Sequence, residues 1–325
     1  GKPFALFIGT HKPHLRWDFP KSFFDNIPDN VTEAPNPAYP VSAPEIHFHD
    51  CAEMSQAYFN TDGVGTALHP PAWQALMRRS YYACVSYVDS LLGQVLDALD
   101  DFGVADDTII ENTARVPLII ADPSKPQSHG KVTSALAELV DIFPTMVELA
   151  GLEAPTGPAG ASLGGVSLAP VLEDPTATVK DVALSQMARC WQNNTRHDPN
   201  QFDGPGDESN HTVSLMSMSD CHWVRRDGID FQGYSVRTAD YRYTEWYTWN
   251  GNTLRPNFDE VVAVEMYNHT VDMGTAAEMS LYENYNLGVD CSTKYPELCH
   301  KLSTTLRATI QKYITPNPPS FKALP

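Results

Sequence analysis

Residues 233–249 read Gly-Tyr-Ser-Val-Arg-Thr-Ala-Asp-Tyr-Arg-Tyr-Thr-Glu-Trp-Tyr-Thr-Trp. On both sides of the Ala239-Asp240 pair, aromatic and β-branched residues alternate with polar ones, which is typical of strands that bury one face. A short polar pair between two such runs predicts a tight β-hairpin, with strands over residues 233–238 and 241–249. This stretch therefore requires an antiparallel sheet in the C-terminal part of the chain.

The sequence around this hairpin extends the sheet and covers it. Residues 261–267 form a third run of strand-forming residues. Farther along, apolar side chains recur at helical spacing and predict a terminal helix that contains Leu298, Leu302, Leu306, Ile310 and Tyr313. We therefore expect a small antiparallel sheet packed against one helix, as a C-terminal domain over residues 181–325.

The N-terminal part of the chain shows a different pattern, in which strands and helices follow one another. Residues 4–8 predict a short buried parallel strand, which ends at Gly9 before a polar loop. A long amphipathic helix is predicted from Pro71 to Gly103. Its apolar face, which we expect to be buried, contains Tyr81, Cys84, Val85, Val88, Leu92, Val95, Leu96 and Leu99.

Three further elements complete this pattern. Strands are predicted over residues 108–110 and 116–121, and a helix over residues 134–150. Strands that alternate with helices indicate an α/β domain with an open sheet, here over residues 1–154. The glycine- and proline-rich stretch 155–180 is expected to be a linker to the C-terminal domain.

Composition and charge restrict the class of protein. The chain has 325 residues, 42% of them hydrophobic, and a net charge of −18 from 40 acidic and 22 basic side chains. This charge disfavours nucleic-acid binding, which needs lysine and arginine to neutralise phosphates. No apolar run approaches the roughly 20 residues of a membrane span, so none is expected. The first residues include no signal peptide and no initiator Met, so we expect a trimmed or partial chain.

The cysteines and sequons indicate an oxidising, secretory environment. No Cys-x-x-Cys pair is present, which excludes zinc ribbons and thioredoxin-like redox motifs. Cys84 is expected to be a buried free thiol, and the pairing of Cys51 stays open. Two disulfides are expected, joining Cys190 to Cys221 and Cys291 to Cys299. Asn-x-Ser/Thr glycosylation sequons begin at Asn30, Asn193, Asn210 and Asn268.

Seven stretches in family order resemble type I sulfatases, and most closely their iduronate-2-sulfatase branch. The first two are Pro-Phe-Ala-Leu-Phe-Ile-Gly-Thr-His-Lys-Pro-His (3–14) and Ser-Tyr-Tyr-Ala-Cys-Val-Ser-Tyr-Val-Asp (80–89). The others are Arg-Val-Pro-Leu-Ile-Ile (115–120), Leu-Val-Asp-Ile-Phe-Pro-Thr (139–145), Gly-Tyr-Ser-Val-Arg-Thr (233–238), Tyr-Arg-Tyr-Thr-Glu-Trp (241–246) and Glu-Met-Tyr-Asn-His-Thr (265–270). Together they extend over nearly the whole chain.

The resemblance implies a fold and a reaction. The fold is an alkaline-phosphatase-like α/β sandwich, present here in part, followed by a small C-terminal sheet domain. For a complete member, the reaction is hydrolysis of a sulfate ester on a sulfated glycan, in the lysosome or outside the cell. Its nucleophile is an aldehyde hydrate made from the cysteine of a Cys-x-Pro/Ala-x-Arg motif. A Ca²⁺ ion on oxygen ligands polarises the sulfate.

The printed sequence lacks the motifs that such a reaction needs. None of the six cysteines begins a Cys-x-Pro/Ala-x-Arg motif, and no Asp-His dipeptide supplies the Asp-His-Gly metal motif. That motif is expected after the strand that ends at Ile110, where the sequence continues directly with Glu111, so we expect an interruption between these two residues. The first metal carboxylates belong to an N-terminal strand that the chain does not contain. The chain by itself is therefore expected to be inactive and to bind no Ca²⁺.

One element of the active site remains by resemblance. His11 matches the family histidine that contacts the sulfate, at the end of a strand where open α/β sheets bind ligands. Lys12 and His14 flank it as candidate substrate-binding residues. A purely structural role for His11, as a loop cap, stays open. The residues His-Phe-His-Asp (47–50) carry metal-ligand side chains at alternating positions, although histidines in such a loop are usually just exposed.

Two functions therefore remain open. The first is a lysosomal or secreted sulfatase, of which this chain is a part. The second is a secreted, catalytically inactive pseudo-sulfatase, a structural or binding glycoprotein that acts through a protein partner or an assembly.

Overall fold

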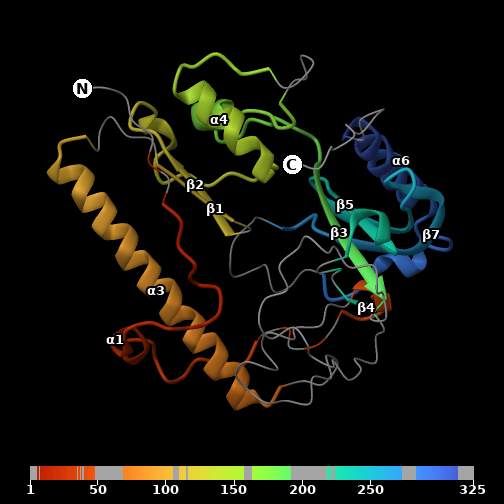
Figure 1. The fold of residues 1–325 in the computed structure, drawn as a ribbon, viewed down its shortest axis with the longest axis horizontal. Helices are drawn as coiled ribbons and strands as arrows, with labels where there is room; N and C mark the ends of the chain where they lie inside the picture. Colours follow the sequence, from red (N-terminus) through yellow and green to blue (C-terminus); the bar gives the residue numbers. More distant parts are fainter. Residues whose placement is uncertain are drawn as a thin grey trace, which may run out of the picture. The chain divides into compact units, whose positions relative to one another are not determined.

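The computed structural model describes residues 6, 8–34, 36, 38, 40–47, 69–104, 110–114, 116–156, 163–191, 218–219, 221, 224–272 and 283–313 (Figure 1). The chain divides into two compact units. Unit 1 comprises residues 1–38 and 68–129, and unit 2 comprises residues 39–67 and 130–325. These units differ from the domains expected from the sequence (1–154, 155–180 and 181–325), and that expected division stays a prediction.

Unit 1 is built around one long helix, α3 (Pro71–Asp101), which pairs with the short helix α1 (Lys21–Asp25). As predicted, α3 begins at the Pro-Pro pair and ends just before Gly103, whose φ of 66° is left-handed and suits glycine. Arg79 of α3 connects the two helices. It donates to the carbonyl oxygen of Ile27 over 3.1 Å, and its guanidinium lies 4.1 Å from the ring centroid of Phe24.

The apolar face of α3 is less covered than the sequence predicts. Ala83 and Cys84 are buried, but Tyr81, Val85 and Leu96 are 41%, 45% and 37% exposed. The pattern identifies an apolar face, but α1 is far too short to cover a helix of 31 residues. Cys84 is a free, buried thiol, as expected, and its burial raises its pKa.

Two strands, β1 (Ile110–Ala114) and β2 (Val116–Ala121), form an antiparallel pair in unit 1. Strand β1 crosses the position where we expected an interruption, since Ile110 pairs with Ala121 and Glu111 pairs with Ile120. Strand β1 therefore continues through this position, and the expectation that residues are missing from the sequence there stays a prediction. The predicted strand over residues 4–8 lies mostly outside the described residues. Its two described members, Leu6 and Ile8, are exposed rather than buried.

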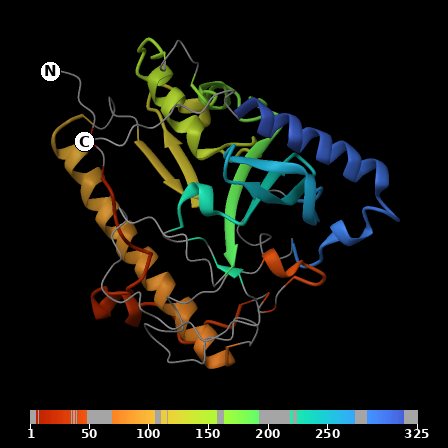
Figure 2. The same ribbon diagram turned by 45° about the vertical axis from the view of Figure 1, so that its right-hand side comes forward.

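Unit 2 contains a five-stranded antiparallel sheet in the order β4-β3-β5-β6-β7 (Figure 2). Its strands are β3 (Ala183–Trp191), β4 (Met218–Ser219), β5 (Phe231–Arg237), β6 (Tyr241–Asn250) and β7 (Arg255–Asn268). The predicted hairpin is confirmed: β5 and β6 turn at Ala239-Asp240, and the backbone N–H of Thr238 donates to Tyr241 over 2.8 Å. Strand β7 is longer than predicted.

Helix α6 (Pro296–Tyr313) covers one face of this sheet, which confirms the predicted terminal helix. Figure 2 shows α6 in dark blue along one side of the strands. The core between them consists of Tyr234, Val236, Tyr243, Tyr247, Met266, Cys299, Leu302, Leu306 and Ile310. Burying the side chain of each valine, leucine, isoleucine or methionine of this core contributes roughly 1.5–3 kcal/mol.

The outer edge of β7 is closed by the side chain of Asn286, which is buried. Its Oδ1 accepts from the backbone N–H of Met266 over 2.9 Å, and its Nδ2 donates to the carbonyl oxygen of Val264 over 3.1 Å. The same Nδ2 also donates to the carbonyl oxygen of Ser42 over 3.1 Å. One amide therefore satisfies the backbone of an edge strand and anchors a distant segment.

The remaining helices of unit 2 are short. They are η1 (Glu45–His47), η5 (Leu139–Asp141), α4 (Ile142–Leu149), α5 (Ala169–Glu173), η7 (Arg226–Gly228) and η9 (Leu287–Asp290). The helix predicted over residues 134–150 begins only at Leu139. The backbone N–H of Glu138 donates to Asp141 over 2.7 Å in a capping box, which fixes this start.

The region predicted as a linker is pinned to α4 where the structure describes it. Asp141, which is fully buried, accepts from the backbone N–H of Val166 over 2.9 Å and from Lys180. The backbone N–H of Leu168 donates to the hydroxyl of Thr145 over 2.8 Å. These contacts make residues 163–180 part of the packed unit.

Both predicted disulfides are confirmed. Cys190 pairs with Cys221, and Cys291 pairs with Cys299. Each typically stabilises a fold by about 2–4 kcal/mol. Cys51 lies outside the described residues. In the described part of the chain, no helix combines the length and apolarity that crossing a membrane requires.

Candidate functional site

The three residues predicted from the resemblance lie together in one loop of unit 1. The ring centroids of His11 and His14 are 4.9 Å apart, and both side chains are exposed. The Nε2 of His11 and the Nδ1 of His14 lie 2.6 Å and 2.8 Å from the carbonyl oxygen of Leu15. Lys12 donates to the carbonyl oxygen of Arg16. The loop thus gathers three side chains that can carry positive charge.

In this conformation the three side chains contact acceptors of their own loop. A carbonyl oxygen is a hydrogen-bond acceptor, and so is an oxygen of a sulfate or phosphate ester. The loop is therefore chemically suited to an anion, which would take the place of these carbonyl contacts. The assigned roles of His11, Lys12 and His14 stay predictions.

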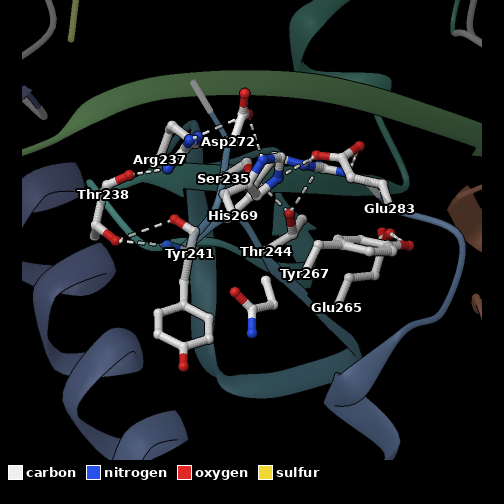
Figure 3. Close-up of polar contacts among 12 residues, drawn as sticks. Ser235, Arg237, Thr238, Tyr241, Thr244, Glu265, Tyr267, His269, Asp272 and Glu283 are labelled. Atoms are coloured by element: carbon white, nitrogen blue, oxygen red, sulfur yellow. Dashed lines mark hydrogen bonds and ion pairs between the residues drawn. The ribbon is translucent and has the colours of Figure 1, made fainter. Parts of the chain in front are cut away.

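A second polar cluster, which the sequence did not predict, lies on the face of the unit 2 sheet away from α6 (Figure 3). Along β5 and β6, its residues alternate with those that pack against α6. It contains Ser235, Arg237, Arg242, Thr244, Glu265, Tyr267, His269, Asp272 and Glu283.

His269 connects two carboxylates at the centre of this cluster. It is buried, with Nδ1 2.9 Å from Asp272 Oδ2 and Nε2 3.0 Å from Glu283 Oε1. Arg242 donates to both oxygens of Glu283, over 2.5 Å and 2.8 Å. Burial alone would raise the pKa of Glu283, but the hydrogen bonds from His269 and Arg242 outweigh it and lower the pKa to about 2. Glu283 is therefore held as a carboxylate.

Arg237 extends the cluster to the β5–β6 turn. Its Nη2 lies 3.5 Å from Asp272, and its Nη1 donates to the carbonyl oxygen of Ala239 over 3.0 Å. Burial lowers the pKa of this guanidinium, although Asp272 and Glu283 oppose the change. On the same face, the hydroxyl of Thr244 donates to Ser235 over 2.8 Å.

A second buried carboxylate, Glu265, is held by three donors. Trp246 Nε1 lies 2.7 Å from it, the hydroxyl of Tyr267 lies 2.8 Å from it and His47 Nδ1 lies 2.6 Å from it. Burial alone would raise its pKa, but the hydrogen bonds, of which that from His47 is the strongest, lower it below the ordinary value. His47 thereby fastens the segment before it to the sheet.

The metal hypothesis for residues 47–50 gains no support from this arrangement, because the Nδ1 of His47 is engaged by Glu265. Residues 48–50 lie outside the described residues. Within the described ranges, no group of three or more histidine, cysteine, aspartate or glutamate side chains could hold a metal ion.

The unit 2 cluster is suited to positioning rather than to chemistry. Two guanidinium groups face two carboxylates across one imidazole, so the charges are matched and each is held in a fixed place. The cluster ties together β5, β6, the end of β7 and residue 283. The sequence signals were the stretches 233–238, 241–246 and 265–270, which the resemblance had marked without indicating the contacts between them.

Comparisons with known proteins agree with the resemblance. The family model described as Sulfatase matches residues 1–114. The chain is 28% identical to the iduronate 2-sulfatase of Mus musculus, in an alignment covering 88% of this chain and 59% of that protein. It is 27% identical to the iduronate 2-sulfatase of Homo sapiens, covering 87% of this chain and 58% of that protein.

Among solved structures, a putative sulfatase from Bacteroides thetaiotaomicron matches with a TM-score of 0.48 and 18% identity, covering 96% of this chain and 55% of that chain. The chain spans 59% of the length of the Mus musculus relative and 58% of the length of the Homo sapiens relative. The family model over residues 1–114 and the two relatives that match over most of the chain thus agree in a similarity to sulfatases.

Proposed function

We propose that the whole protein hydrolyses a sulfate ester, with a sulfated glycan as its substrate. The observation that carries this proposal is the match to two iduronate 2-sulfatases over 88% and 87% of the chain. The loop that contains His11 and His14 supports it, because several side chains that can be cationic suit a sulfate anion.

In this proposal His11 contacts the sulfate, while Lys12 and His14 bind the substrate beside it. Each side chain exchanges a carbonyl acceptor of its own loop for an acceptor oxygen of the ester. Since one acceptor replaces another, the exchange leaves no donor unsatisfied.

The nucleophile and the metal are not assigned to residues of this chain. A Ca²⁺ ion in a complete family member would polarise the sulfate oxygens. The described residues bring together no ligand set for it, and no cysteine of the 325 residues begins the nucleophile motif. We therefore expect the 325-residue chain by itself to be inactive and to bind no Ca²⁺.

The proposed location is secreted, extracellular or lysosomal. Two disulfides within unit 2 support it, because such bonds persist in oxidising compartments.

The test compares the natural protein with the 325-residue chain on a chromogenic aryl sulfate and on a 2-sulfated iduronate disaccharide. The natural protein is expected to release sulfate, and His11→Ala is expected to lower its kcat/KM by about 100-fold or more. His300→Ala serves as the control, since His300 is exposed on α6. Equal effects of the two substitutions would refute the role of His11.

A second candidate is a catalytically inactive pseudo-sulfatase that acts as a secreted binding or structural glycoprotein. One observation favours it: β1 runs from Ile110 into Glu111 where the Asp-His-Gly metal motif is expected. A natural protein that binds the sulfated disaccharide without releasing sulfate, and whose intact mass matches the 325 residues plus glycans, would support this candidate over the first.

A further inference from the structure

The sequon Asn268-His269-Thr270 at the end of β7 has no role in the proposed sulfatase reaction. The structure places the side chains of Asn268 and Thr270 at the surface, whereas the residue between them, His269, is buried. The two groups that an N-glycosylation acceptor needs are thus on the outside of a fixed turn.

A hydrogen bond of the turn fixes the orientation of the side-chain amide of Asn268. Its Oδ1 accepts from the backbone N–H of Thr270 over 2.8 Å. Among the described residues, neither the Nδ2 of Asn268 nor the hydroxyl of Thr270 has a hydrogen-bond partner. A substituent on Nδ2 would therefore displace no contact of the fold.

The buried residue of the sequon keeps the turn in place. His269 is fixed by Asp272 and Glu283 at 2.9 Å and 3.0 Å, and its backbone N–H donates to Asp240 over 2.7 Å. With the middle residue anchored inward, its two neighbours stay exposed, and a bulky group attached at Asn268 projects into solvent.

Another described sequon provides a contrast. Asn30 is exposed, but the hydroxyl of Thr32 accepts from Arg78 over 3.2 Å, and the carbonyl oxygen of Thr32 accepts from the same guanidinium over 2.6 Å. The sequons at Asn193 and Asn210 lie outside the described residues. Asn268 is therefore the position for which the structure makes the sharpest case.

We propose that Asn268 carries an N-linked glycan. The Nδ2 of Asn268 forms a bond to the anomeric carbon of an oligosaccharide donated by a lipid-linked pyrophosphate. The bond from that carbon to the pyrophosphate oxygen breaks, the lipid pyrophosphate leaves, and the amide loses one proton. The two disulfides of unit 2 are consistent with passage through the secretory compartment where this transfer occurs.

The position also gives the glycan a physical consequence. Strand β7 is at the edge of the five-stranded sheet, and Asn268 is its last residue. Exposed strand edges are sites of unwanted pairing between molecules. A glycan there covers the end of the edge strand, beyond the part that Asn286 closes.

The test is peptide mapping of the protein secreted from a eukaryotic host. Treatment with peptide-N-glycosidase in heavy-oxygen water is expected to convert Asn268 into isotopically labelled aspartate in most molecules. Thr270→Ala is expected to abolish the label and the corresponding mass shift, whereas Thr270→Ser preserves both. Asn252→Gln, in the exposed β6–β7 turn and outside any sequon, is the matched control and retains the glycan.

Unmodified Asn268 as the main form of the wild-type peptide overturns the proposal. This measurement uses the wild-type protein, so it decides the question even if a variant is not secreted. A glycan that persists in Thr270→Ala also contradicts it, because the modification would then not depend on the sequon.

Discussion

Replacing Gly165 by alanine would place its Cβ 2.0 Å from the carbonyl oxygen of Val140 and 2.4 Å from the carbonyl carbon. Ordinary contacts of a Cβ begin near 3.4 Å, so one of the two backbone segments has to move by more than 1 Å. Both segments belong to unit 2. Neither can move without disturbing two hydrogen bonds that join them, from Val166 to Asp141 and from Leu168 to Thr145.

The magnitude comes from those hydrogen bonds. The residue after Gly165 donates its N–H to Asp141 over 2.9 Å, and Leu168 donates to Thr145 over 2.8 Å. Both acceptors are fully buried, so water cannot replace the lost partners. An unsatisfied buried group costs about 1–3 kcal/mol, which gives a predicted loss of about 2–6 kcal/mol for Gly165→Ala.

The neighbouring Gly164 is the matched control. An alanine Cβ there meets no heavy atom within 4 Å, and its φ is not left-handed. Gly164→Ala is expected to stabilise by about 0.4–1 kcal/mol, because it reduces the freedom of the unfolded chain. Urea unfolding followed by tryptophan fluorescence measures both free energies. If the unfolding free energies of Gly165→Ala and Gly164→Ala differed by less than about 0.5 kcal/mol, the close approach of Gly165 to Val140 would not constrain the fold.

Three further predictions concern unit 2. Lys180→Met leaves the buried Asp141 and the partly buried Glu138 without their cation and is expected to destabilise by about 3–5 kcal/mol in urea unfolding, whereas exposed Lys131→Met should change little. Because the pKa of Glu283 is lowered from 4.5 to about 2, its stabilisation is present above pH 4.5 and is lost as pH falls toward 2. Glu283→Gln should flatten this acid dependence by up to about 3 kcal/mol, and an unchanged pH profile of the unfolding midpoint would contradict it. Gly233→Ala puts a Cβ 2.6 Å from the Trp246 ring and should destabilise by about 1–3 kcal/mol with a changed near-ultraviolet circular dichroism spectrum.

The parts of the fold that were predictable are those specified by neighbouring residues. The β5–β6 hairpin follows from local alternation around Ala239-Asp240, and α6 follows from apolar residues at helical spacing. The stops at Gly103 and Gly151 follow from left-handed positions, with φ of 66° and 64°. Each of these signals lies within a few residues of the feature it predicts.

The parts that were missed depend on distant partners. The helix predicted from residue 134 starts later, at a capping box whose two carboxylates, Glu138 and Asp141, are also bound by Lys180, 42 and 39 positions away. The apolar face of α3 was visible in the sequence, but a periodic pattern does not say what covers a face. The same limit explains why the expected burial failed there.

The polar cluster of unit 2 was missed for a similar reason. His269 and Glu283 are 14 positions apart, and Arg242 and Glu283 are 41 positions apart. Charged residues at such separations resemble an ordinary solvated surface in the sequence. The pairing of β5, β6 and β7 brings Arg242 and the end of β7 onto one face, and the segment that contains Glu283 meets them there.

The hydrogen bonds of the Asn286 side chain require an amide at this position and exclude aspartate, the product of its deamidation. Its Nδ2 must donate to the carbonyl oxygens of Ser42 and Val264, while its Oδ1 must accept from backbone N–H groups. Deamidation would keep the shape but turn the donor into an anionic oxygen that faces two carbonyl oxygens. Aspartate has the size of asparagine but cannot donate to these two carbonyl oxygens. The folded sheet should therefore disfavour deamidation of Asn286. A molecule that is deamidated while unfolded should refold poorly.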